Sequence, residues 1–255
     1  MELRKSKKLT PSKEIAYIAV MSALLIGGQF VFSFVAGVEI VTLLLACFSY
    51  SFGMRRGAIG ALAFSLLRCL LFGFHPTVII LYLIYYPVLA LIFGALGHIK
   101  DSTFEKYPAL FAVIINILLL GIACACAVCY GLDLIKVSRI YKVTVYVLLW
   151  VVFALSAGMC IAFDCLLVAK KVFKKNTGNA LKLITFASIA AFCTICFTLL
   201  DDIITPIFWG YNSTTALAYF YTSFTAMLPQ TVCVIVTLAT LFLPVTALFD
   251  RIIKA

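Results

Sequence analysis

Arg68 stands inside an otherwise apolar stretch of this 255-residue chain, and packing alone does not account for it. The residue lies about six positions, roughly 9 Å of helix, from the outer end of its apolar segment. A guanidinium within hydrocarbon costs several kcal/mol unless it is paired, hydrated or brought to the head groups. Two interpretations stay open: a structural role, by snorkelling or pairing with a carboxylate, and a role in holding an anionic ligand group.

Other polar side chains near the same ends of the apolar segments are candidate partners of Arg68. The predicted substrate-binding set is Arg68, Gln29, Glu39, Asp202 and Gln230. Gln29 and Gln230 could equally form hydrogen bonds with neighbouring helices. Asp201 and Asp202 point about 100° apart on a helix, so at most one of them is expected to face inward. A solvated helix end is the alternative for this pair.

Three tyrosines, Tyr82, Tyr85 and Tyr86, follow one another along the fourth apolar segment. They could line a site for a flat ligand. Packing in the core or anchoring at the membrane interface is the favoured interpretation, because aromatic rings commonly serve those roles in membrane helices.

Cysteines and catalytic motifs give no indication of an enzyme or a metal site. Cys124, Cys126 and Cys129 are closely spaced, but residues two apart point to nearly opposite sides of a helix, and no His or carboxylate cluster lies near them. The ten cysteines are therefore expected to pack rather than to form disulfides. No Walker loop, HExxH or GxSxG occurs in the sequence. We predict a non-catalytic protein without cofactor or metal.

The composition places these residues in a membrane. Hydrophobic residues make up 65% of the chain and charged residues 12%, with a mean hydropathy of +1.16. Too few charged residues are present to cover a soluble domain, so lipid must be the solvent for much of the surface. The net charge of +10 consequently says little about nucleic acid.

We predict an all-α integral membrane protein, a polytopic helical bundle of about eight spans that forms one transmembrane domain over residues 1–255. The predicted spans are 14–35, 39–54, 57–74, 77–97, 108–130, 143–169, 183–204 and 222–249. The second span is short for a full crossing. Pro229 and Pro244 are expected to bend or break the last one.

The basic residues set the predicted orientation. With the N-terminus inside, most of the 20 lysines and arginines fall on the cytoplasmic side, as the positive-inside rule requires. We therefore expect a multi-pass protein of the cell membrane with both termini in the cytoplasm.

Small residues form a stripe along the first span: Ala16, Ala19, Ala23 and Gly27. Their spacing of three and four places them on one helix face. Small side chains allow another helix to approach closely in lipid. The stripe could pack inside this protein or offer a docking surface to a separate membrane subunit.

Several motifs follow the small-residue stripe in order: FVFSFVAGVEIVTLL (30–44), SFGMRRG (51–57), LLFGFHP (70–76) and FGALG (93–97). Taken together in this order, they resemble the substrate-binding S components of energy-coupling factor (ECF) vitamin transporters. A weaker likeness returns over residues 183–250, in SFTAMLPQTVCVIV and FLPVTALFDR. The resemblance covers roughly 60% of the chain; residues 108–169 have no counterpart and look like an extra hairpin beside a six-span core.

The resemblance implies a subunit that binds a vitamin or similar small nutrient from outside the cell. Its implied partners are a transmembrane coupling protein and two ATPase subunits, which would hydrolyse the ATP. Ala19 and Ala23 match the small-xxx-small coupling motif, and Gly27 continues it. Some relatives carry an Asp-His-Asn set where this chain has Leu228 to Val232, so the ligand is not assigned by analogy.

Two other function classes stay open beside this hypothesis. A membrane-embedded enzyme or lipid-handling protein would need several polar residues to converge at one depth of the bilayer. A structural membrane partner would have no ligand of its own.

Overall fold

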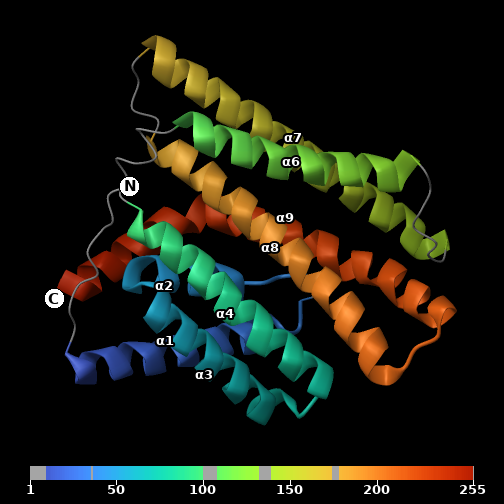
Figure 1. Ribbon diagram of the computed structural model, residues 1–255, viewed down its shortest axis with the longest axis horizontal. Helices are drawn as coiled ribbons and strands as arrows, with labels where there is room; N and C mark the ends of the chain where they lie inside the picture. Colours follow the sequence, from blue (N-terminus) through green and yellow to red (C-terminus); the bar gives the residue numbers. More distant parts are fainter. Residues whose placement is uncertain (1–9, 36, 100–107, 132–138, 174–177, 255) are drawn as a thin grey trace. The chain divides into compact units, whose positions relative to one another are not determined.

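The structure is a computed structural model that describes residues 10–35, 37–99, 108–131, 139–173 and 178–254. Within these ranges every element is an α-helix (Figure 1). The helices are α1 (Pro11–Phe32), α2 (Val41–Phe52), α3 (Met54–Phe72), α4 (Pro76–His98), α6 (Pro108–Gly131), α7 (Arg139–Phe173), α8 (Gly178–Trp209) and α9 (Ser213–Lys254). The all-α prediction is confirmed for these residues, and each predicted span overlaps one of these helices.

Within the described ranges, five helical segments are long and apolar enough to cross a membrane, as expected of a multi-pass membrane protein. They are Pro11–Phe32, Pro76–His98, Tyr146–Ala169, Gly178–Trp209 and Ser213–Ile253. The second helix has only 12 residues, about 18 Å, and so is shorter than the hydrocarbon layer, as the sequence predicted.

Of the two outcomes expected of the prolines in the last span, a bend or a break, the structure excludes the break. Helix α9 continues through Pro229 and Pro244 without interruption. Each proline removes one backbone hydrogen bond, whereas a broken helix would leave several backbone groups unpaired in lipid, each at a cost of several kcal/mol. Continuity is therefore the cheaper state in an apolar solvent.

The last two helices also extend further than predicted. Helix α8 runs on to Trp209 rather than ending at residue 204, and α9 begins at Ser213 rather than at residue 222. The backbone N–H of Thr215 donates to Asn212 Oδ1 at 2.8 Å, so Asn212 caps the start of α9. Polar residues before the apolar run thus belong to the helix.

The chain divides into two compact units, which are described separately. The first comprises Met1–Thr103 with Thr240–Ala255, and the second comprises Phe104–Ala239. In the first unit α2 is buried along most of its length. Phe48 of α2 packs against Phe52 and against Phe249 of α9, with ring centroids 4.6 and 6.3 Å apart.

Glycines bring α4 against the junction of α2 and α3. Gly53 joins the two helices with a φ of 93°, which an L-residue rarely adopts. A Cβ on Gly94 would lie 2.5 Å from the Met54 Cα, and a Cβ on Gly97 would overlap the Tyr50 carbonyl oxygen. The FGALG motif is therefore the packing surface of α4, and we call this contact the glycine seam.

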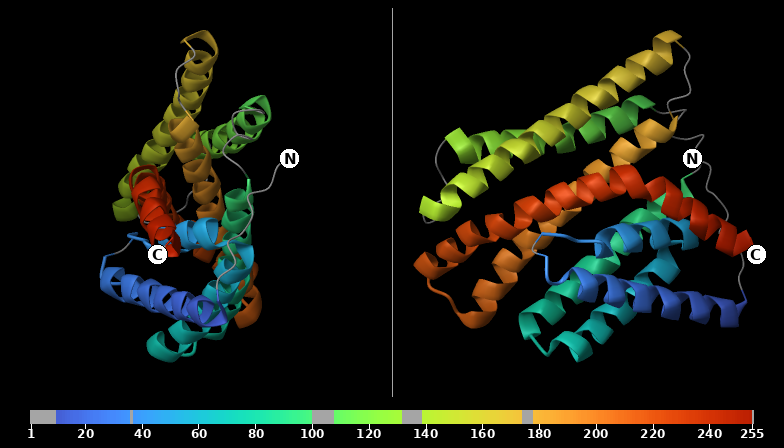
Figure 2. Two further views of the ribbon diagram at one scale, coloured as in Figure 1. Left: turned by 90° about the vertical axis from the view of Figure 1, so that its left-hand side faces the viewer. Right: turned by 180° about the vertical axis from the view of Figure 1, so that it is seen from behind.

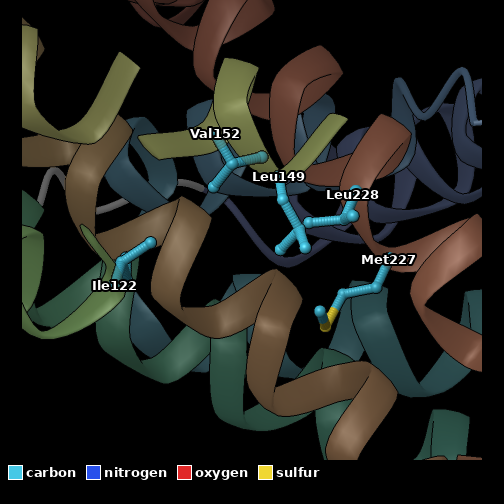
Figure 3. Packing of buried hydrophobic residues seen from close by; sticks show 5 residues of the cluster. All are labelled: Ile122, Leu149, Val152, Met227 and Leu228. Carbon is cyan, nitrogen blue, oxygen red and sulfur yellow. The ribbon is translucent and has the colours of Figure 1, made fainter. Parts of the chain in front are cut away.

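In the second unit α6 and α7 run side by side as a hairpin and both contact α8 (Figures 1 and 2). One core cluster joins Ile122, Leu149, Val152, Met227 and Leu228, and Figure 3 shows Leu149 and Leu228 pointing toward one another. Asn116 of α6 donates to Asp164 of α7 at 3.0 Å.

Candidate functional site

Arg68 lies in the last turn and a half of α3 and turns toward α4. Its Cζ atom sits 4.5 Å from the ring centroid of Tyr82 and 5.5 Å from that of Phe72. Both distances fit cation–π contacts. Its Nε and Nη1 atoms are buried and have no hydrogen-bond partner within the part of the chain that the structure describes. The side chain therefore packs on two aromatic rings and keeps two donors that no described residue engages.

Gln29 reaches the same tyrosine from α1. Its Nε2 atom donates to the Tyr82 hydroxyl at 3.1 Å. Its Oε1 atom is buried and has no hydrogen-bond partner among the described residues. Arg68 and Gln29 thus contact one phenol, Arg68 on the ring face and Gln29 at the hydroxyl.

Glu39 lies in the linker between α1 and α2, outside both helices. Its Oε1 atom accepts hydrogen bonds from Thr42 Oγ1 at 2.6 Å and from the Tyr86 hydroxyl at 3.4 Å. Burial raises the pKa of Glu39, although these two hydrogen bonds act in the opposite direction. The carboxyl group is therefore easier to protonate than one in water.

Tyr82, Tyr85 and Tyr86 are buried and pack on one another, which confirms the core-packing interpretation. Tyr86 lies 4.8 Å from Tyr82 and 5.1 Å from Tyr85, between ring centroids in edge-on contact. Tyr82 connects to Arg68 and Gln29, and Tyr86 connects to Glu39. Sequence reasoning missed this bridging role. The signal was present in the i, i+4 spacing of Tyr82 and Tyr86, which places both on one helix face.

Three of the five predicted substrate-binding residues, Gln29, Glu39 and Arg68, meet around these tyrosines in the first unit. The other two, Asp202 and Gln230, belong to the second unit. Gln230 is half-buried in α9.

Asp201 and Asp202 both bond to α9, so the expectation that at most one of them faces inward is wrong. Tyr219 donates to Asp201 Oδ2 at 2.7 Å, and Ser223 donates to Asp202 Oδ2 at 2.9 Å. Tyr219 and Ser223 are four residues apart and so lie on one face of α9. Although the two carboxylates point in different directions from α8, this one face of α9 reaches both of them. Asp202 Oδ1 is buried and has no hydrogen-bond partner within the described ranges.

An open apolar groove of about 880 Å³ runs between α1 and α3 in the first unit. Ala19, Ala23 and Gly27 line its α1 side, and all three are exposed. A Cβ on Gly27 would meet nothing within 4 Å. The small-residue stripe is therefore not consumed by packing within this unit.

Comparisons with protein-family models, with characterised proteins and with solved structures gave no match to this chain. Within the described residues, no group of three or more His, Cys, Asp or Glu side chains could hold a metal ion. The site is thus characterised by its own chemistry: two guanidinium donors, one amide and one carboxyl group around buried phenols.

Proposed function

We propose that this chain is the substrate-binding membrane subunit of an ECF-type, ATP-driven importer for a vitamin or similar small nutrient. The observation that carries the proposal is a set of three buried polar atoms without a hydrogen-bond partner among the described residues: Nε and Nη1 of Arg68 and Oε1 of Gln29. A buried donor or acceptor without a partner costs about 1–3 kcal/mol, and more when it is charged. A ligand that supplies the missing partners would recover this free energy.

The groove between α1 and α3 supports the second half of the proposal, an association with a separate membrane subunit. Lipid provides no hydrophobic drive for helix association, so helices in membranes join where small residues permit close approach. Ala19 and Ala23 offer such a surface and are exposed along the groove. A helix of the coupling protein would dock there.

The division of labour follows from what the chain contains. We propose that it binds the nutrient and that two partner ATPases supply the energy, since its sequence has no nucleotide-binding loop. In the proposed topology all eight helices cross or enter the membrane, with both termini in the cytoplasm.

A co-purification experiment tests the association. The tagged chain would be extracted gently from the membranes in which it is made, and the bound proteins identified. The unchanged chain is expected to retain a coupling protein and two ATPases. Ala19→Leu and Ala23→Leu would place branched side chains in the groove and release them.

Ala95→Leu is the matched control, because Ala95 is exposed on α4 of the same unit but does not line the groove. It should leave the assembly intact. Retention of the same three subunits by both groove variants would contradict docking on α1. A chain that is never recovered with ATPases would contradict the importer itself.

A further inference from the structure

The groove between α1 and α3 is open and apolar along its length. Its lining on α1 extends from Ile15 to Phe30, about 22 Å of helix. That length exceeds half of a hydrocarbon layer of about 30 Å. An acyl chain that enters from the leaflet at the N-terminus of α1 can therefore lie along the groove over its whole depth.

Such a groove does not stay empty in a bilayer. Apolar atoms that face a void lose their dispersion contacts on that side. Lipid tails are as apolar as the isoleucines and leucines of the lining, so a tail enters the groove without burying any polar group. The lining also leaves room, since a Cβ on Gly27 would meet nothing within 4 Å. An acyl chain is therefore the expected content of the groove in the isolated chain.

One end of the groove is basic. Glu14 Oε1 of α1 lies 3.5 Å from Arg56 Nε of α3, which brings the first turns of the two helices together. Lys13 and Arg55, their neighbours in the sequence, are both exposed. Arg55 precedes Ile59 of the lining by four residues and so lies on the same face of α3. Three basic side chains and one acidic one give this end a net charge of +2.

The opposite end of the groove is closed by aromatic rings, Phe30 and Phe72. Arg68 does not line the groove, and its Nε and Nη1 atoms are buried. The end of α9 lies on another face of α1, because the Tyr17 hydroxyl donates to the Ile252 carbonyl at 3.5 Å and Tyr17 does not line the groove. The basic end therefore sets the direction in which a lipid would lie.

We infer that, in the isolated chain, the groove binds one anionic phospholipid. One acyl chain lies between α1 and α3, and the headgroup lies at Arg55 and Lys13. Basic residues at a membrane surface attract anionic lipids, with an effect of about fivefold in affinity for each residue. A second copy of this chain fits less well, because in the same membrane orientation its own basic end would meet this one.

The lipid site goes beyond the proposed importer and does not rest on it. In the proposed assembly the partner helix would take the place of the lipid. The test uses the isolated full chain, so lipid binding and subunit association can fail independently.

Native mass spectrometry of the full chain in a neutral detergent measures lipid binding directly. The chain would be titrated with phosphatidylglycerol and, in parallel, with phosphatidylcholine that has the same acyl chains. One phosphatidylglycerol should bind about five- to thirtyfold more tightly than phosphatidylcholine, because the basic end carries two net charges. Equal binding of the two lipids would overturn the inference, since the groove would then be no more than a contact with bulk lipid.

Arg55→Gln tests the headgroup. It should weaken phosphatidylglycerol binding about fivefold and leave phosphatidylcholine binding unchanged. Arg251→Gln is the matched control, because Arg251 is an exposed base beside Ile252 at the end of α9, away from the groove. Its effect should be smaller. Equal losses in the two variants would contradict the inference, because diffuse surface charge would then select the lipid.

Ala23→Leu tests the acyl chain. Ala23 lines the groove and is exposed, so the leucine side chain would occupy the space of the acyl chain and leave the fold intact. Both lipids should bind at least about fivefold more weakly. Ala95→Leu, on α4 and outside the groove, should bind both lipids as the unchanged chain does.

Two results with Ala23→Leu would overturn the inference. One is lipid binding equal to that of the unchanged chain. The other is a dimer of the unchanged chain that Ala23→Leu dissociates, because a second copy would then be the occupant of the groove.

Discussion

Small residues serve two different purposes on the two sides of α3. On the side of α4, Gly94 and Gly97 leave no space: an added Cβ would run into the backbone at Met54 or Tyr50. On the side of α1, Gly27 borders an open groove and an added Cβ would touch nothing. In the sequence both sets look alike, as small residues three or four positions apart in apolar helices.

The difference separates folding from function. A small residue that admits a neighbouring backbone is required by the fold, and its replacement is expected to destabilise the protein. A small residue that borders empty space is not required by the packing of the chain, so its replacement is expected to leave the fold intact. A larger side chain there would instead fill the groove.

The largest expected effect is at the glycine seam. Gly97→Ala would overlap the Tyr50 carbonyl oxygen, and backbone cannot move aside as a side-chain tip can. The free energy of unfolding should fall by about 3 kcal/mol or more. Thermal unfolding of the purified chain would measure this. If Gly97→Ala were as stable as the unchanged protein, the close contact between Gly97 and the Tyr50 backbone would be contradicted.

A smaller loss is expected at the junction of α2 and α3. Gly53 has a φ of 93°, so Gly53→Ala should cost about 1–2 kcal/mol in backbone strain. The same thermal assay applies, with Ala95→Leu as an exposed control. An effect as large as that of Gly97→Ala would mean that contact, rather than conformation, limits this position.

Glu39 tests the packing around α4 without changing a glycine, because its carboxyl group accepts a hydrogen bond from the Tyr86 hydroxyl of α4. Its raised pKa means that the folded chain binds the proton more tightly than the unfolded chain. The free energy of unfolding therefore falls as the pH rises from the pKa of Glu39 in the unfolded chain through its higher pKa in the folded chain. Glu39→Gln should remove this dependence and gain stability relative to the unchanged chain toward neutral pH.

Melting temperatures of both chains from about pH 4 to about pH 8 would measure the difference. If the melting temperatures of the unchanged chain and of Glu39→Gln changed with pH in parallel, the burial of an ionisable Glu39 would be contradicted. The groove glycines should show no such dependence, because none of them titrates.

The smallest effect is expected at the groove. Gly27→Ala should be neutral or stabilise by up to about 1 kcal/mol, because alanine restricts the unfolded chain and favours helix. Thermal unfolding beside Gly97→Ala gives the contrast directly. A loss of stability at Gly27 comparable to that at Gly97 would abolish the distinction between the two sides of α3.

The sequence predicted the helices well because their signal is simple. Long apolar runs between charged or glycine-containing breaks located the eight helices of the described residues, and the only large errors concern α8 and α9. There the rules of aqueous helices were misleading: Pro229 and Pro244 do not end α9, and the polar stretch after Asn212 is helical. Lipid penalises an open backbone more than water does.

The site was predicted in part. Arg68, Gln29 and Glu39 stood out because polar residues in apolar segments are rare, and the structure places them around Tyr82 and Tyr86. Their connection through tyrosines could not be derived, since it depends on which faces of α1, α3 and α4 meet. The glycine seam and the groove were indistinguishable for the same reason.

Native mass spectrometry of the full chain, extracted gently from the membranes in which it is made, tests the central claim most directly. The account predicts a complex of the chain with a coupling protein and two ATPases, carrying a small nutrient. Ala19→Leu should lose the three subunits and keep the nutrient. A solitary chain without bound small molecule, unchanged by Arg68→Gln or Ala19→Leu, would contradict the account.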